Sequence, residues 1–145
     1  MQPYPHNYLV RAAGGPSGTV LVSADGVVDI PTAPPPEFDG PGDVWSPETL
    51  LCASVANCFI LTFRAIARAS KFEWNDLSCR VEGVLERAEG GTQFTRFTTY
   101  ATLLVPPGTD EAKARKLLEK AEHGCLVTKS LRGAQALVAD VTYSG

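Results

Sequence analysis

The order of the predicted elements indicates an α+β fold for this chain of 145 residues. Strand-like segments rich in β-branched residues lie on both sides of one long apolar helix, an amphipathic helix follows, and a last strand ends the chain. Runs of strands around helices, in place of strict alternation, are typical of α+β proteins. We expect the order β-β-β-α-β-β-α-β in a single domain that spans residues 1–145.

The first third of the chain predicts a small antiparallel meander that is unstable by itself. Three short segments have strand character, and Asp25-Gly26 is a hairpin signal between the last two; the segments are residues 6–13, 19–23 and 27–30. Residues 31–45 follow with five prolines, which cannot donate to a strand ladder, so this segment is an extended connector. We expect Phe38 and Trp45 to anchor it by packing.

Residues 46–70 predict the central helix. Ser46 suits the N-cap, Pro47 the first helical position, and Glu48 the positive end of the helix dipole. Residues 50–63 carry no charge, and a helix that is apolar on all sides is typically buried. This run is too short to span a bilayer, so we expect no membrane partner.

The rest of the chain predicts two strands, a helix, a short helix and a final strand. The amphipathic helix has one apolar stripe and a charged outer face, and Gly124 suits its C-terminal stop. The expected elements are strands 77–85 and 94–105, helix 109–124, short helix 125–131 and strand 134–143.

Composition limits the classes of partner and the compartment. The net charge is −3 without a basic cluster, which argues against a nucleic-acid partner. The four cysteines form neither a disulfide framework nor a CxxC zinc pattern. The N-terminal segment has no apolar signal region, so we expect a cytoplasmic protein with reduced thiols.

Two of the cysteines are candidates for chemistry. Cys52 and Cys58 point about 120° apart around one helix, so they cannot bridge each other. Cys52 and Cys79 are interpreted as small buried hydrophobic residues. Cys58 has small neighbours on its helix face, and Cys125 opens a short helix whose dipole favours a thiolate. From the residues alone, a redox pair and a set of inert thiols both remain open.

At these residues the sequence resembles the OsmC/Ohr family, osmotically inducible protein C and organic hydroperoxide resistance protein, and within it the OsmC-like subgroup. Matching segments are Ser-Pro-Glu-Thr-Leu-Leu at 46–51, Ala-Asn-Cys-Phe at 56–59 and Glu-His-Gly-Cys-Leu-Val at 122–127, followed by Ser130-Leu131. Their spacing and the order of elements agree with the family along nearly the whole chain.

The resemblance implies an intertwined homodimer whose sheets wrap around central helices. It also implies a thiol peroxidase: Cys58 would attack an organic hydroperoxide and become a sulfenic acid, and Cys125 would resolve it as a disulfide. Glu48 would orient a cation beside the thiolate. An external dithiol would reduce the disulfide, and no metal or bound cofactor would be needed.

One family feature is missing from its usual places. The activating arginine normally lies in the N-terminal glycine turn or in the connector, and neither contains one here. The cations left as candidates are Arg11, Arg96, Arg132 and a protonated His6. Without a cation we expect burial to raise the pKa of Cys58 and slow its reactions. This favours an alternative function, a non-enzymatic OsmC-like dimer that binds an apolar small molecule, whereas the two cysteines in register favour the peroxidase.

Overall fold

A computed structural model describes residues 1–145, and they form two compact units. The first unit contains residues 1–51 and the second contains residues 52–145. The division falls within α1 (Pro47–Ala69), the long helix predicted from the sequence. We describe each unit by itself, and a single domain over residues 1–145 stays a prediction.

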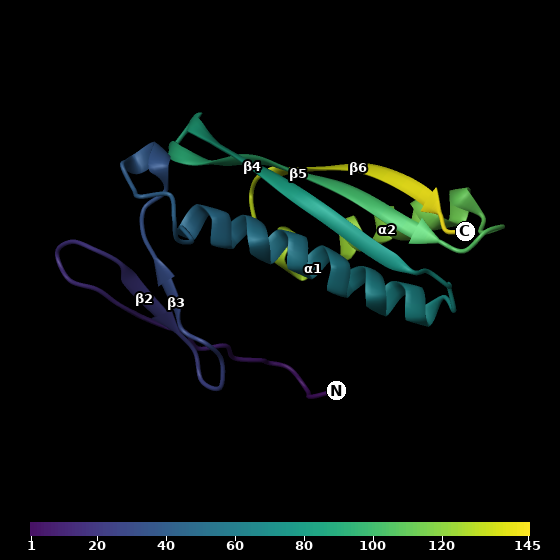
Figure 1. The fold of residues 1–145 in the computed structure, drawn as a ribbon, viewed down its shortest axis with the longest axis horizontal. Coiled ribbons are helices and arrows are strands. Elements are labelled where there is room, and N and C mark those ends of the chain that lie inside the picture. Colours follow the sequence, from purple (N-terminus) through teal and green to yellow (C-terminus); the bar gives the residue numbers. More distant parts are fainter. The chain divides into compact units, whose positions relative to one another are not determined.

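The first unit is a three-stranded antiparallel sheet in the order β1-β2-β3. Figure 1 labels two of these strands, β2 and β3. Its strands are shorter than predicted: β1 (Arg11–Ala13), β2 (Val20–Ser23) and β3 (Ile30–Thr32). Pairing in β1 stops at Arg11, whose register partner is Ser23. The pairing of Val22 with Ile30 puts Val27 and Val28 in the connecting loop, where both are exposed.

The connector folds back on the end of β3. It contains one turn of 3-10 helix, η1 (Pro36–Phe38), and the backbone N–H of Ala33 donates to the carbonyl of Trp45 at 3.0 Å. Gly40 lies so close to Pro34 that a Cβ would come within 1.6 Å of its carbonyl oxygen. The expectation that Phe38 and Trp45 anchor the connector is wrong within this chain, because both side chains are exposed.

The start of α1 is capped as its sequence predicts. Ser46 is buried, and its hydroxyl accepts from the backbone N–H of Thr49 at 3.1 Å. In return, the hydroxyl of Thr49 accepts from the backbone N–H of Ser46 at 3.0 Å. This reciprocal pair is a capping box with threonine in place of the usual acid or amide.

The second unit has a sheet in the order β4-β5-β6, which Figure 1 shows as three adjacent ribbons. β4 and β5 are antiparallel, whereas β5 and β6 are parallel and are connected through two helices. All five elements lie close to the predicted segments, and β6 has the predicted bounds. They are β4 (Asp76–Ala88), β5 (Gly91–Val105), α2 (Glu111–Gly124), α3 (Leu126–Lys129) and β6 (Ala134–Tyr143).

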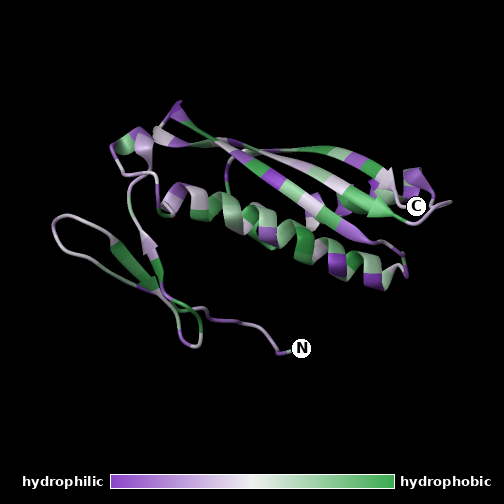
Figure 2. Ribbon diagram, viewed as in Figure 1, coloured by the Kyte–Doolittle hydropathy of each residue, from purple (hydrophilic) through white to green (hydrophobic).

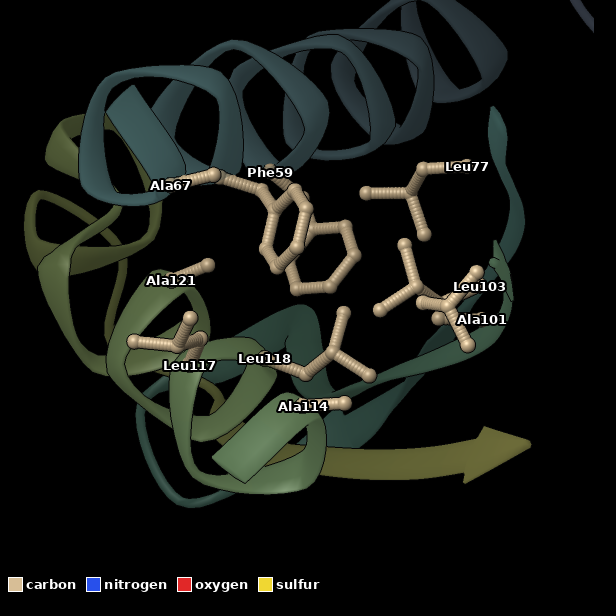
Figure 3. Close-up of a cluster of buried hydrophobic side chains, with 11 residues drawn as sticks. Phe59, Ala67, Leu77, Ala101, Leu103, Ala114, Leu117, Leu118 and Ala121 are labelled. Carbon is tan, nitrogen blue, oxygen red and sulfur yellow. The ribbon is translucent and has the colours of Figure 1, made fainter. Parts of the chain in front are cut away.

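The core of the second unit lies between α1, α2 and one face of the sheet (Figure 3). α1 contributes Phe59, Phe63 and Ala67, and these pack against residues of the sheet and of α2. The other buried members are Leu77, Ala101, Leu103, Val105, Ala114, Leu117, Leu118 and Ala121. The buried residues of α1 are four positions apart and those of β5 are two positions apart. A helix and a strand with these spacings each bury one face.

α1 is apolar along much of its length (Figure 2). It is nevertheless not buried all round. Its buried residues repeat every four positions, and an exposed stripe runs along the other side. The stripe consists of Ser54, Asn57, Leu61, Arg64, Ala65 and Arg68. By length and composition, α1 is the one helix that could cross a membrane. The core helix of a soluble protein can have the same length and composition.

Candidate active site

Cys58 lies halfway along α1, at the border between the buried face and the exposed stripe. The next residue, Phe59, is buried in the core and fixes the rotation of the helix. One turn further on, the hydroxyl of Thr62 lies 3.7 Å from the Cys58 sulfur, within hydrogen-bonding range of a thiol. The sulfur is therefore half-buried and has a polar neighbour on its own helix.

Cys125 lies in the turn between α2 and α3. It is extended, with φ −66° and ψ 117°, and ends α2 while it precedes the first residue of α3. Only 1% of its surface is exposed. Gly124 is the last residue of α2 and has no left-handed conformation, so the stop does not depend on positive φ. A Cβ at Gly124 would lie 3.6 Å from the methyl carbon of Thr62, which puts the turn against α1.

The two cysteines are free thiols, and each shifts the pKa of the other, so the two side chains are neighbours. Burial raises the pKa of Cys58, but the side chain of Cys125, the backbone of Val127, the hydroxyl of Thr62 and the backbone of Leu126 all stabilise its thiolate. These hydrogen bonds outweigh desolvation and lower the pKa of Cys58 below its ordinary value. The expected increase in the pKa of Cys58 is therefore wrong, because donors take the place of a cation.

The pKa of Cys125 moves in the opposite direction. Burial raises it, and so does the hydrogen bond to Cys58, while the backbone and hydroxyl of Thr128 offset part of this. The expectation that the short helix favours a Cys125 thiolate is wrong, because burial, the largest effect on its pKa, outweighs the hydrogen bonds from Thr128 of α3. Cys58 is thus the thiol of the pair that ionises first, and Cys125 is the one that stays protonated to higher pH.

The remaining cysteines lie between α1 and β4, Cys52 on the helix and Cys79 on the strand. A Cβ at Gly83 would come within 2.7 Å of the Cys52 sulfur, and the thiol of Cys79 donates to the carbonyl of Ala56 at 3.6 Å. Burial raises the pKa of both thiols. Both have the surroundings of the small packed residues that the sequence predicts.

No lysine, arginine or histidine is among the groups that shift the pKa of Cys58. The predicted cation beside the thiolate is therefore not found within this chain. Arg11 is paired with Asp25 at 2.6 Å, and His6 stacks on Tyr4 with ring centroids 4.6 Å apart. Arg96 and Arg132 are exposed. Glu48 lies in the first turn of α1, in the first unit, and does not contribute to the hydrogen bonds at Cys58.

Sequence reasoning missed the donors that surround Cys58. Thr62 had a visible signal, because residues four apart on a helix are neighbours. The amides of Leu126 and Val127 had none, since only tertiary folding brings them to α1.

In the described chain, no group of three or more His, Cys, Asp or Glu side chains is arranged to hold a metal ion.

Fold and site together define an α+β protein with a thiol pair between a core helix and the turn that follows a second helix. The profile of the family described as "OsmC-like protein" matches residues 40–138. The chain therefore belongs to the OsmC-like family.

Individual relatives agree with this assignment. The chain is 31% identical over 125 residues to an organic hydroperoxide resistance protein of Xanthomonas axonopodis, with 84% of each chain covered. It is 29% identical over 102 residues, 68% of each chain, to the uncharacterised protein YmaD of Bacillus subtilis.

Solved structures share the fold, which confirms the predicted OsmC/Ohr-like α+β architecture. An organic hydroperoxide resistance protein of Legionella pneumophila superposes with a TM-score of 0.76 at 27% identity, over 97% of this chain and 99% of that one. An OsmC-like protein of unknown function from Vibrio cholerae superposes with a TM-score of 0.82 at 16% identity, over 94% and 99% of the two chains.

Proposed function

We propose that this protein is a thiol-dependent peroxidase that reduces organic hydroperoxides in oxidative stress defence. The observation that carries the proposal is that Cys58 and Cys125 are neighbours whose pKa values move in opposite directions: hydrogen bonds lower that of Cys58, while burial and the Cys58 thiol raise that of Cys125. Relatives named organic hydroperoxide resistance protein support the same class of substrate.

In the proposed reaction, the Cys58 thiolate attacks the outer oxygen of the hydroperoxide. The O–O bond breaks, the sulfur is oxidised to a sulfenic acid, and the leaving alkoxide takes up a proton to become an alcohol. Cys125 then attacks the sulfenic sulfur, a disulfide forms, and water leaves. An external dithiol reduces the disulfide by exchange and is itself oxidised, which returns both thiols.

Two further parts of the proposal concern the setting of this cycle. We propose an intertwined homodimer in which Glu48 orients a cation, in line with the resemblance to the family. We also propose a cytoplasmic location, where a reduced thiol pool would supply the dithiol.

The alternative, a dimer that binds an apolar small molecule, depends on an unreactive Cys58. The lowered pKa of Cys58 argues against it. In addition, a hollow of about 380 Å³ between α2 and β6 is lined by polar side chains such as Arg115, Glu119 and His123 and does not include Cys58. The binding function is therefore kept as an outcome of the test.

Serine variants of the four cysteines test the peroxidase directly, with consumption of cumene hydroperoxide measured in the presence of a dithiol. Cys58→Ser should abolish consumption. Cys125→Ser should allow one turnover and then leave Cys58 open to overoxidation, detected by mass. Cys52→Ser and Cys79→Ser are matched controls that should retain activity. Full consumption by Cys58→Ser would contradict the proposal, and no consumption by the unmodified protein would favour the binding function.

A further inference from the structure

Four groups stabilise the Cys58 thiolate by hydrogen bonds, and only two of them are side chains, Cys125 and Thr62. In the proposed reaction Cys125 stops being a hydrogen-bond donor when its sulfur forms the disulfide with Cys58. Thr62 is therefore the side-chain donor to Cys58 that takes no part in the disulfide.

Thr62 lies beside the turn that carries Cys125. Its methyl group faces Gly124, where a Cβ would lie 3.6 Å away, and its hydroxyl lies 3.7 Å from the Cys58 sulfur. A threonine in a helix has few side-chain rotamers. With the methyl group on the side of Gly124, the hydroxyl lies on the side of the sulfur.

The direction of this hydrogen bond follows from the charge on sulfur. In the neutral pair either group can donate, but a thiolate has no proton, so the hydroxyl of Thr62 must then donate to it. Hydrogen bonds to an ionised partner are stronger than neutral ones. The contact consequently favours the ionised form of Cys58 over the protonated form.

We propose that Thr62 is a further catalytic residue of this site, whose hydroxyl donates a hydrogen bond to the Cys58 sulfur and holds it as the reactive thiolate. The role in catalysis rests on the proposed peroxidase function, whereas the hydrogen bond itself does not. In this chain, Thr62 and two backbone amides supply stabilisation that a neighbouring cation would otherwise give.

The test is the pH dependence of Cys58 alkylation by iodoacetamide in the full-length reduced protein, followed by peptide mapping. Thr62→Val replaces the hydroxyl with a methyl group of similar size, and Thr62→Ser retains the hydroxyl. Thr62→Val should shift the alkylation midpoint of Cys58 to higher pH and slow its alkylation at pH 7 roughly threefold or more, the size of a modest hydrogen bond. Thr62→Ser should remain close to the unmodified protein.

Two controls separate the hydrogen bond from other causes. Cys52 and Cys79 in the same digest should keep their alkylation rates, which checks that the fold is retained, and Thr62→Ala should reproduce the effect if Thr62→Val folds poorly. Unchanged Cys58 midpoints in both hydroxyl-free variants, or an equal shift in Thr62→Ser, would overturn the proposal. Alkylation needs no hydroperoxide, so failure of the peroxidase would be recognised separately. The rate of Cys58 oxidation by cumene hydroperoxide should fall by the same factor as alkylation.

Discussion

At the residue scale, the four thiols of one chain differ because their surroundings differ. Cys58 has several hydrogen-bond donors, whereas desolvation dominates at Cys52, Cys79 and Cys125. The pKa of Cys58 is lowered from the ordinary value of a cysteine thiol, and the pKa values of the other three are raised from it.

We therefore predict that Cys58 is the first thiol to be alkylated as pH rises. A lowered pKa means a larger thiolate fraction at every pH below 9.0, and the thiolate is the nucleophile. Site-resolved alkylation from about pH 5 to about pH 11, a range that brackets the ordinary pKa of cysteine, should give a lower midpoint for Cys58 than for the other three thiols. A midpoint for Cys58 at or above that of Cys52 would contradict the assignment.

At the element scale, the N-cap of α1, which the sequence predicts at Ser46, should contribute to the free energy of unfolding. The buried hydroxyl of Ser46 satisfies the N–H of Thr49 at the helix start. Ser46→Ala should therefore lower the free energy of unfolding by about 1 kcal/mol, measured by denaturant titration. Ser17→Ala, in an exposed turn, is the matched control and should have little effect. Equal stability of the two variants would show that the cap is dispensable.

The packing of α1 against β4 gives a second prediction at this scale. A methyl group at Gly83 would meet the Cys52 sulfur at 2.7 Å and the Phe94 ring at 3.0 Å. Gly83→Ala should lower the free energy of unfolding by about 1–3 kcal/mol, as overpacking does. In a Cys52→Ala background the loss should be smaller, because one of the two clashes is removed. A loss that is independent of residue 52 would place the strain elsewhere.

Elements were predictable where the pattern is local. The uncharged run of α1, the alternation of β5 and the amphipathic stripe of α2 all depend on neighbours in sequence. β1 was overextended because residues 6–10 alternate without a partner strand to pair with. At the candidate site, the choice of Cys58 and Cys125 stays a prediction, and the direction of the Cys58 pKa shift was predicted wrongly. It depends on backbone amides of α3 that no local pattern places beside α1.

At the scale of the whole molecule, much apolar surface is left without cover in one chain. In the first unit Tyr8, Leu9, Val28 and Trp45 are exposed, and in the second unit Leu61 and Leu126 are exposed. Surfaces of this kind are typical of protein interfaces. They support the proposed homodimer, in which a second copy would cover them.

We predict that the protein sediments as a dimer at micromolar concentration and that Leu61→Glu dissociates or unfolds it. Leu61 lies on the exposed stripe of α1 and is 51% exposed in the single chain. Val138 is equally exposed at 51% but lies in register with Tyr100 and Arg80 on the face of the sheet opposite the core. Val138→Glu is therefore the matched control and should remain dimeric. A folded monomer of the unmodified protein would contradict the prediction.

The central claim is that Cys58 and Cys125 act together as the reactive pair. The most direct measurement is peptide mapping of the unmodified protein after one equivalent of cumene hydroperoxide, with free thiols blocked before digestion. The account predicts a disulfide between Cys58 and Cys125, the loss of two hydrogen atoms in the intact mass, and blocked thiols at Cys52 and Cys79. Four blocked thiols after excess hydroperoxide, or a disulfide between any other pair, would contradict it.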